Sequence, residues 1–275
     1  MSRRPLSPVW IVLTLAAAAC GNGKDAGAPP PKAPPVASSS VAAITYQVIN
    51  IFPHDARSFT EGLELHDSIL YESEGNFGES SLSTYRLSDG KRLMQKPLGN
   101  DFFGEGITVL GDRLYQLTYK EQKVFVYHYP DLAPLAPLEW PHEGWGMTND
   151  GTRLIADDGS ATLYFIDPAT FHETGRVTVT DENGPVDQLN ELEYVDGVVY
   201  ANRWHTNQIL RIDPHTGKVT GRIDLGDLLA QAGQTAQLQD PREDVLNGIA
   251  YSAQRKTFIV TGKHWPHAYE IRLFP

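Results

Sequence analysis

The stretch Phe102-Phe-Gly-Glu-Gly-Ile-Thr-Val-Leu-Gly-Asp-Arg-Leu-Tyr-Gln-Leu-Thr-Tyr119 decides the fold of this 275-residue chain. It predicts two alternating β-strands joined by a tight turn at Gly111-Asp112, because such turns need a positive φ that glycine adopts without strain. Glu105 stands between two glycines, where the backbone can approach a ligand closely. A single carboxylate of this kind is more often solvated than catalytic, so its interpretation depends on the rest of the chain.

The same sequence motif recurs along the chain. Related segments begin at Phe59, Gly144, Leu189 and Leu246. When the five are aligned on Gly62, Gly106, Gly146, Leu192 and Gly248, they lie 44, 40, 46 and 56 residues apart. A period of about 40–50 residues with several strands per unit is typical of propeller blades. The sequence therefore predicts an all-β fold, a five-bladed β-propeller.

The two ends of the repeated region predict how the propeller closes. Each repeat continues with a second pair of strands, but the last one stops at Phe274, one strand short. The segment Ile44–Ile51 is a spare strand at the other end. Since a closed ring leaves no exposed strand edge, we expect this segment to complete the last blade. Short helices are expected only at 225–232 and 235–244.

The N-terminus has the features of an export signal. Arg3 and Arg4 precede a short apolar run and four alanines, and Cys20 follows them directly. The run is too short to span a membrane. We predict a signal peptide over 1–20, a Pro/Ala/Ser-rich disordered linker over 21–43 and the propeller over 44–275. Cys20 resembles the lipidated cysteine of a bacterial lipobox, although Ala17 replaces the usual leucine. This predicts a periplasmic or outer-membrane-anchored lipoprotein, and simple cleavage and secretion is the alternative.

Composition argues against several classes of function. The formal net charge of −11 becomes −13 once Arg3 and Arg4 are removed with the signal peptide. An acidic chain is a poor partner for nucleic acid or anionic membranes. The single cysteine excludes an intrachain disulfide. The nine histidines lack metal-ligand spacing, so we expect no metal and no cofactor. The acidic turns 157–159 and 181–183 could hold Ca²⁺, but such turns are usually only solvated.

The start of each repeat should lie nearest the propeller axis, so side chains near these starts should meet in one pocket. A small cage of aromatic walls with a few polar groups is typical of a ligand site. We expect Trp140 to pack between blades. Trp145 lies between two glycines, and we expect it to line the pocket. The predicted pocket residues are Phe59, Glu61, Phe103, Glu105, Trp145, Asn190, Glu191 and Asn247, with Trp204 and Lys263 from hairpin ends.

These segments resemble the plant-type glutaminyl-peptide cyclotransferases over nearly all of 44–274. The resemblance rests on long, ordered motifs such as Phe103-Gly-Glu-Gly106, His142-Glu-Gly-Trp-Gly146, Leu189-Asn-Glu-Leu-Glu-Tyr194 and Val260-Thr-Gly-Lys-His-Trp-Pro266. It implies a five-bladed propeller that converts the N-terminal glutamine of peptides or proteins to pyroglutamate. It also implies that ammonia is released without a metal. We expect the protein to be a monomer.

The resemblance also implies roles for individual residues. It places the essential general acid/base on Glu105 and polar contacts on Asn190 and Lys263, either of which could stabilise the oxyanion. Substrate-binding positions fall on Phe59, Glu61, Phe103, Tyr119, Trp145 and Trp204. Two of these depart from the plant form, because Glu61 replaces a glutamine and Tyr119 a tryptophan. The second carboxylate predicts a changed pH dependence or substrate range, with the reaction retained.

Two other classes of function stay open at this point. One is a calcium-dependent propeller lactonase, which would need an axial metal site and a sixth repeat. The other is a non-catalytic envelope scaffold that binds peptides on one face of the propeller. Release of ammonia from a Gln-initiated dipeptide would separate both from a cyclotransferase.

Overall fold

The computed structural model describes residues 41–232, 240 and 242–274. All of them belong to one compact unit, Ser38–Pro275; a second unit, Met1–Ala37, lies outside the described residues. The predicted signal peptide and most of the predicted linker therefore lie outside them as well. Among the described residues, none of the helical structure is long and apolar enough to cross a membrane.

Nearly all regular structure in the described residues is β-strand. One four-stranded sheet contains β2 (Thr60–His66), β3 (Ile69–Glu74), β4 (Ser81–Arg86) and β5 (Lys91–Pro97). A second sheet contains β6 (Gly104–Leu110), β7 (Arg113–Thr118), β8 (Lys123–His128) and the short outer strands β9 (Ala133–Pro134) and β10 (Leu138–Glu139). A third contains β11 (Met147–Asn149), β12 (Leu154–Ala156), β13 (Thr162–Ile166) and β14 (Glu173–Thr178).

The remaining strands form a small two-stranded sheet and one sheet of eight strands. The small sheet pairs β15 (Thr180–Asp181) with β16 (Gly184–Pro185). Half of the large sheet is β17 (Leu189–Val195), β18 (Val198–Arg203), β19 (Gln208–Ile212) and β20 (Val219–Asp224). The other half is β21 (Leu246–Ser252), β22 (Thr257–Gly262), β23 (His267–Phe274) and β1 (Ala42–Pro53).

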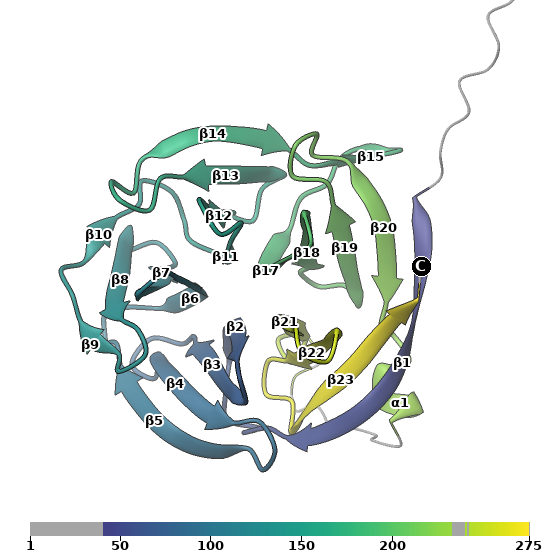
Figure 1. Ribbon diagram of the computed structural model, residues 1–275, viewed down its shortest axis with the longest axis horizontal. Helices are drawn as coiled ribbons and strands as arrows, with labels where there is room; N and C mark the ends of the chain where they lie inside the picture. The colour runs from purple at the N-terminus through teal and green to yellow at the C-terminus, as the bar shows by residue number, and fades with distance from the viewer. Residues whose placement is uncertain (1–40, 233–239, 241, 275) are drawn as a thin grey trace, which may run out of the picture. The chain divides into compact units, whose positions relative to one another are not determined.

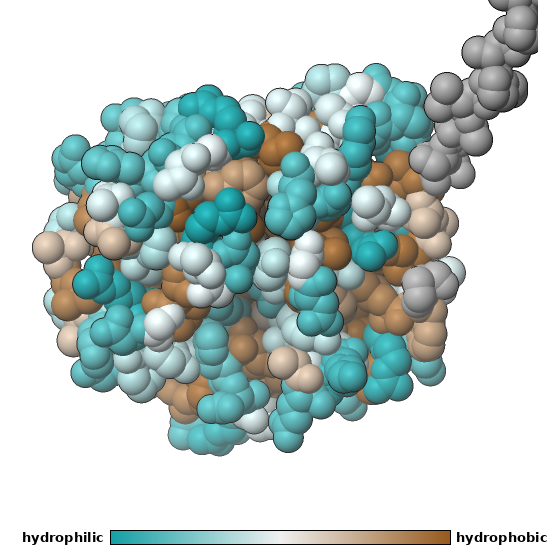
Figure 2. Space-filling model, turned by 45° about the horizontal axis from the view of Figure 1, so that its top comes forward, coloured by the Kyte–Doolittle hydropathy of each residue, from teal (hydrophilic) through white to brown (hydrophobic). Residues whose placement is uncertain are grey.

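The sheets are arranged around a central axis, with β2, β6, β11, β17 and β21 innermost (Figure 1). The predicted all-β, propeller-like fold is thereby confirmed. The eight-stranded sheet spans two of the predicted repeats, and the number of blades stays a prediction. On the face seen in Figure 2, hydrophilic side chains are interspersed with smaller apolar patches.

Strand β1 joins the two ends of the described chain. It pairs antiparallel with β23, from Thr45 opposite Phe274 to Pro53 opposite His267. The N-terminal strand thus completes the last repeat, as the sequence predicted, although it begins at Ala42 and ends at Pro53. A second contact was not predicted: residues 42–44 pair in parallel with 221–223 of β20. One strand therefore covers the edges of two others.

Local sequence signals were accurate where they concerned turns and less so for helices. The two-residue turn at Gly111-Asp112 joins β6 to β7, and Gly111 has a φ of +65°. The helix expected at 225–232 is shorter, since α1 covers only Leu228–Gln231. Most of the helix expected at 235–244 lies outside the described residues. Trp140 is a packing residue, 1% exposed within an apolar cluster, as expected.

A β-bulge lies near the start of the innermost strand in four of the five predicted repeats and re-aims the side chain at that point. The strand register shifts between Thr60 and Gly62, 104 and 107, 189 and 192, and 246 and 249. A bulge inserts an extra residue and re-aims the side chains beside it. The residues at equivalent points of these four bulges are Glu61, Glu105, Asn190 and Asn247. Trp145, just before β11, holds the corresponding place in the third repeat.

The bulges correct one detail of the sequence alignment. In the fourth repeat the residue equivalent to Gly106 is Glu191, not Leu192, because Asn190 and Glu191 together occupy the bulge. Glycine is needed at the other positions for close packing. A Cβ at Gly106 would lie 2.4 Å from the Met147 amide nitrogen, and one at Gly146 would lie 2.1 Å from the Asn190 carbonyl oxygen.

Glu191 connects three repeats and does not line the pocket, contrary to the expectation from sequence. Its two carboxylate oxygens accept hydrogen bonds from the backbone N–H groups of Leu63, at 3.1 Å, and Ile249, at 2.7 Å. The side chain is buried, and burial raises its pKa well above the usual range. Since buried backbone donors need partners, this carboxyl acts as a structural link between innermost strands.

We expect Glu191→Ala to destabilise the protein by about 2–4 kcal/mol, because two buried N–H groups would each lose their acceptor. The measurement is the urea midpoint of unfolding compared with that of Glu79→Ala, which alters an exposed glutamate. Equal midpoints for the two variants would show that Glu191 does not hold the strands together.

Candidate active site

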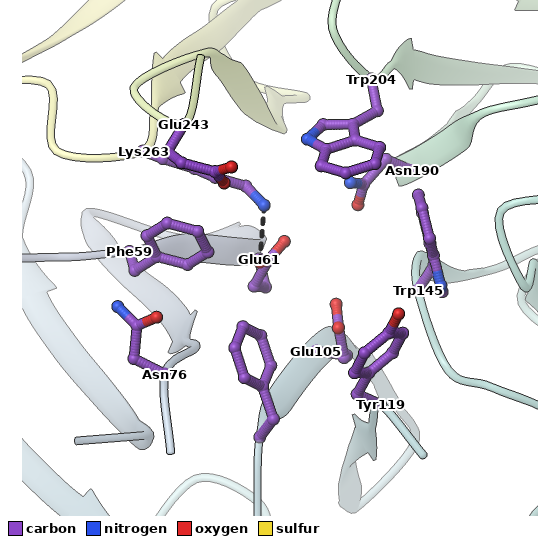
Figure 3. Close-up of a pocket in the computed structure, with 11 residues that line it drawn as sticks. Phe59, Glu61, Asn76, Glu105, Tyr119, Trp145, Asn190, Trp204, Glu243 and Lys263 are labelled. Atoms are coloured by element: carbon purple, nitrogen blue, oxygen red, sulfur yellow. Dashed lines mark hydrogen bonds and ion pairs between the residues drawn. The ribbon is translucent and has the colours of Figure 1, made fainter. Parts of the chain in front are cut away.

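The innermost strands and their adjoining loops enclose a cavity of about 220 Å³. All nine residues that the sequence assigned to catalysis or substrate binding line it. The lining consists of Phe59, Glu61, Asn76, Phe103, Glu105, Tyr119, Trp145, Asn190, Trp204, Glu243 and Lys263 (Figure 3). Of the ten residues that the repeats predicted for the pocket, eight line this cavity, and Glu191 and Asn247 do not.

The side chains reach the cavity from equivalent places in different repeats. Glu61, Glu105 and Asn190 lie in the bulges of β2, β6 and β17. Trp204 and Lys263 directly follow β18 and β22, the second strands of their repeats. Because the strand ends converge on one axis, residues 202 positions apart in sequence come into contact here.

Two of the carboxylates that line the pocket, Glu61 and Glu105, have different surroundings, and Glu61 is paired with a cation. Lys263 Nζ donates a hydrogen bond of 2.6 Å to Glu61 Oε1, and the Asn247 amide nitrogen donates to Glu61 Oε2 at 3.1 Å. Nζ also lies 4.4 Å from the ring centre of Phe59 and 5.9 Å from that of Trp204. Both side chains are almost completely buried, so the pair is held in place by contacts on all sides.

Glu105 has no comparable partner. No hydrogen bond or ion pair from the described residues reaches its carboxylate, which points into the pocket (Figure 3). Burial, and next the charge of Glu61, raise the pKa of Glu105 well above its usual value, while Lys263 opposes that rise. A carboxyl whose pKa is raised in this way holds a proton more readily than an ordinary glutamate, so it is suited to accept a proton and pass it on.

Aromatic rings form a continuous wall around the two carboxylates. Each ring meets the next at an angle, with centroids 6.0 Å apart for Phe59 and Phe103, then 5.9, 6.5 and 5.3 Å for the next three pairs. The order along the wall is Phe59, Phe103, Tyr119, Trp145 and Trp204. Such a wall is rigid and apolar, so it can hold a small ligand in one conformation at low entropic cost.

Three buried polar atoms of residues that line the pocket have no hydrogen-bond partner among the described residues. Asn190 Oδ1 and the indole nitrogens of Trp145 and Trp204 are buried without a hydrogen bond to any described residue. Buried polar groups are normally satisfied, and unsatisfied ones need an explanation. A ligand with its own donors and acceptors would supply the missing partners.

The structure also adds residues that the sequence did not point to. Asn76 and Glu243 line the pocket but lie in loops outside the repeated phrases. For Asn76 the sequence did contain a signal, because the Gly75-Asn76 pair is typical of a tight turn, and Asn76 does have a φ of +80°. Asn247, expected in the pocket, instead supports Glu61 from behind. His264 packs edge-on against Phe59, at 5.3 Å, and its Nδ1 lies 2.8 Å from Asp244 Oδ1.

Within residues 41–232, 240 and 242–274, no group of three or more His, Cys, Asp or Glu side chains is placed to hold a metal ion. The acidic turns named above have other contacts. Asp157 Oδ1 accepts a hydrogen bond from the Gly159 N–H, and Asp181 and Glu182 both pair with Arg222.

Comparisons with known proteins agree with this geometry. A sequence model of the glutamine cyclotransferase family matches residues 12–273. A curated glutaminyl-peptide cyclotransferase of Arabidopsis thaliana is 38% identical over 232 residues, covering 82% of this chain and 71% of its own. The crystal structure of Myxococcus xanthus glutaminyl cyclase is similar with a TM-score of 0.78 and 36% identity, covering 85% of this chain and 98% of that one. The extent of these matches establishes that this chain belongs to the glutamine cyclotransferase family.

Proposed function

We propose that this protein cyclises the N-terminal glutamine of peptides or proteins to pyroglutamate and releases ammonia, with Glu105 as the single general acid/base and no metal ion. The observation that carries the proposal is an unpartnered, buried carboxyl facing an aromatic pocket beside a lysine that is already paired. Membership of the glutamine cyclotransferase family supports the reaction.

Positioning supplies much of the catalysis. The α-amine nitrogen must form a bond to the γ-amide carbon of the same residue, and the bond from that carbon to the amide nitrogen must break. Since both groups belong to one glutamine, holding it in a folded conformation turns a rare encounter into a frequent one. The aromatic wall from Phe59 to Trp204 is suited to this role.

One carboxyl can carry out both proton transfers. Glu105 takes a proton from the attacking α-amine and delivers it to the departing amide nitrogen, which leaves as ammonia. The raised pKa of Glu105 favours the second step, because a carboxyl with the ordinary pKa of a glutamate would be ionised near neutral pH and would have no proton to donate. The carboxyl ends the cycle in its starting state.

The developing negative charge on the amide oxygen needs a donor. We assign this role to Lys263, because its Nζ is a strong hydrogen-bond donor held by Glu61 in a buried site, where electrostatic stabilisation is strong. Asn190, whose Oδ1 has no partner among the described residues, is assigned to a donor group of the substrate, such as its amide NH₂.

The test of the proposed function is the release of ammonia from a Gln-initiated dipeptide by the purified protein, with the pyroglutamyl product identified by mass. A protein that binds the peptide and releases no ammonia would be a peptide-binding scaffold. A protein that instead hydrolyses lactones would belong to the other alternative class.

Activity is expected to survive prolonged dialysis against EDTA or a heterocyclic zinc chelator, because proton transfer and charge stabilisation are both assigned to side chains. The measurement is the rate of ammonia release before and after dialysis, with protein dialysed against plain buffer as the control. A rate lost to the chelator and restored by Zn²⁺ or Ca²⁺ would refute the metal-free mechanism.

A further inference from the structure

The loop between β3 and β4 presents an exposed aromatic ring beside the pocket. Phe77 is 57% exposed, more than any other large apolar side chain among the described residues. The loop that carries it is held in shape, since the Asn76 carbonyl oxygen accepts hydrogen bonds from the backbone N–H groups of Glu79 and Ser80 and from the Ser80 hydroxyl. The backbone that carries the ring is therefore held in place by hydrogen bonds.

Phe77 extends the aromatic wall of the pocket outward. Its ring meets that of Phe103 at a steep angle, with centroids 5.5 Å apart, and both Phe103 and the neighbouring Asn76 line the cavity. The space beside it is open, because a Cβ added at Gly78 would meet no atom within 4 Å. An exposed aromatic ring that continues a ligand pocket is a ready contact for an apolar part of the ligand.

The proposed reaction determines which part of the peptide substrate lies outside the pocket. The α-amine and the γ-amide both belong to the first residue, so the remainder of the peptide must leave through the mouth. The second residue is then the first to meet the rim. Other exposed neighbours of the wall are polar: Lys120 lies over the Tyr119 ring and near Glu143, and His205 packs on Trp204. Phe77 alone among these rim neighbours offers a large apolar surface.

We propose that Phe77 forms a binding subsite for an apolar or aromatic side chain at the second position of the substrate. Peptides that begin Gln-Phe are then better substrates than peptides that begin Gln-Gly. This inference rests on the proposed cyclisation and adds a substrate preference to it. Because the contact lies away from the reacting atoms, it acts equally on the ground state and the transition state, and therefore changes KM and leaves kcat little altered.

The test compares kcat/KM for Gln-Phe, Gln-Gly and glutaminamide, which has no second residue. In the unaltered protein we expect Gln-Phe to exceed Gln-Gly by about 3- to 10-fold, the effect of one aromatic contact. In Phe77→Ala this ratio should fall to about one, and Phe77→Leu, which keeps an apolar side chain, should retain part of it.

A matched control is Leu135→Ala, which removes another exposed apolar side chain, 41% exposed, from a position outside the pocket lining. It should leave the ratio as in the unaltered protein. An unchanged ratio in Phe77→Ala would overturn the subsite. So would an equal fall for all three substrates, because it would mean that Phe77 only supports the ring of Phe103. If the unaltered protein released ammonia from none of the three substrates, that result would instead overturn the proposed function, and the subsite with it.

Discussion

Replacing Glu105 with glutamine is expected to slow ammonia release from Gln-initiated peptides by about 10²–10⁴-fold, the usual contribution of general acid–base catalysis. Glutamine keeps the size of the side chain but cannot exchange a proton with the substrate. The fold should be retained, since no hydrogen bond from the described residues to the Glu105 carboxylate is lost. Substrate affinity should change little, because the aromatic wall is intact.

Glu61→Gln is the matched control, because it makes the same change at the equivalent bulge of a neighbouring repeat. We expect most of the activity to remain, since Glu61 is paired with Lys263 and a glutamine oxygen can still accept a hydrogen bond from Nζ. The pH profile should move. Removing the charge of Glu61 lowers the pKa of Glu105, so the acid limb of kcat/KM should shift to lower pH.

The measurement is the rate against pH for both variants, with thermal unfolding to confirm that each is folded. If Glu61→Gln proved inactive and Glu105→Gln active, the roles assigned to the two carboxylates would be reversed. An acid limb of the Glu61→Gln profile that moved to higher pH would contradict the electrostatic coupling between them.

Deleting the N-terminal strand is expected to prevent folding. A chain that begins at His54 lacks β1, which pairs with β23 over most of its length and with β20 at its start. Two strand edges would then be exposed, and unprotected edges pair with other chains. The cluster around Ile44 would lose buried apolar surface, and the hydrogen bonds from Tyr46 to Asp227 and from Asn50 to Glu270 would be lost. We expect the shortened protein in the insoluble fraction.

The control is a chain that begins at Ser38, where the compact unit starts, and it should be soluble and fold normally. A synthetic peptide of residues 41–53 added during refolding should increase the yield of the shortened chain, because it supplies the missing strand in trans. Equal solubility and equal melting temperatures for the two chains would show that β1 does not close the structure.

The sequence was sufficient for features that follow from local patterns. The repeated phrase with its glycines indicated the innermost strands, because alternation and turn residues are read within a few positions. The spacing of the repeats then predicted ten residues that would meet at the axis, and eight of them line one cavity, whereas Glu191 and Asn247 do not. The pairing of residues 44–51 with β23 was also predicted, because a strand was missing at one end and spare at the other.

The repeats alone could not rank Glu61 and Glu105, because the two have the same place in equivalent repeats, and only the family resemblance assigned the acid/base role to Glu105. The tertiary structure shows the physical difference between them. Their difference comes from Lys263, which is 202 residues from Glu61 in sequence and contacts it through the closure of the strands around the axis. Strand register also decides that Glu191, and not Leu192, is equivalent to Gly106. It likewise decides that Glu191 contacts Leu63 and Ile249. A periodic sequence determines which strands form and which way their side chains alternate, whereas the partner of a buried charge is decided by packing between distant segments.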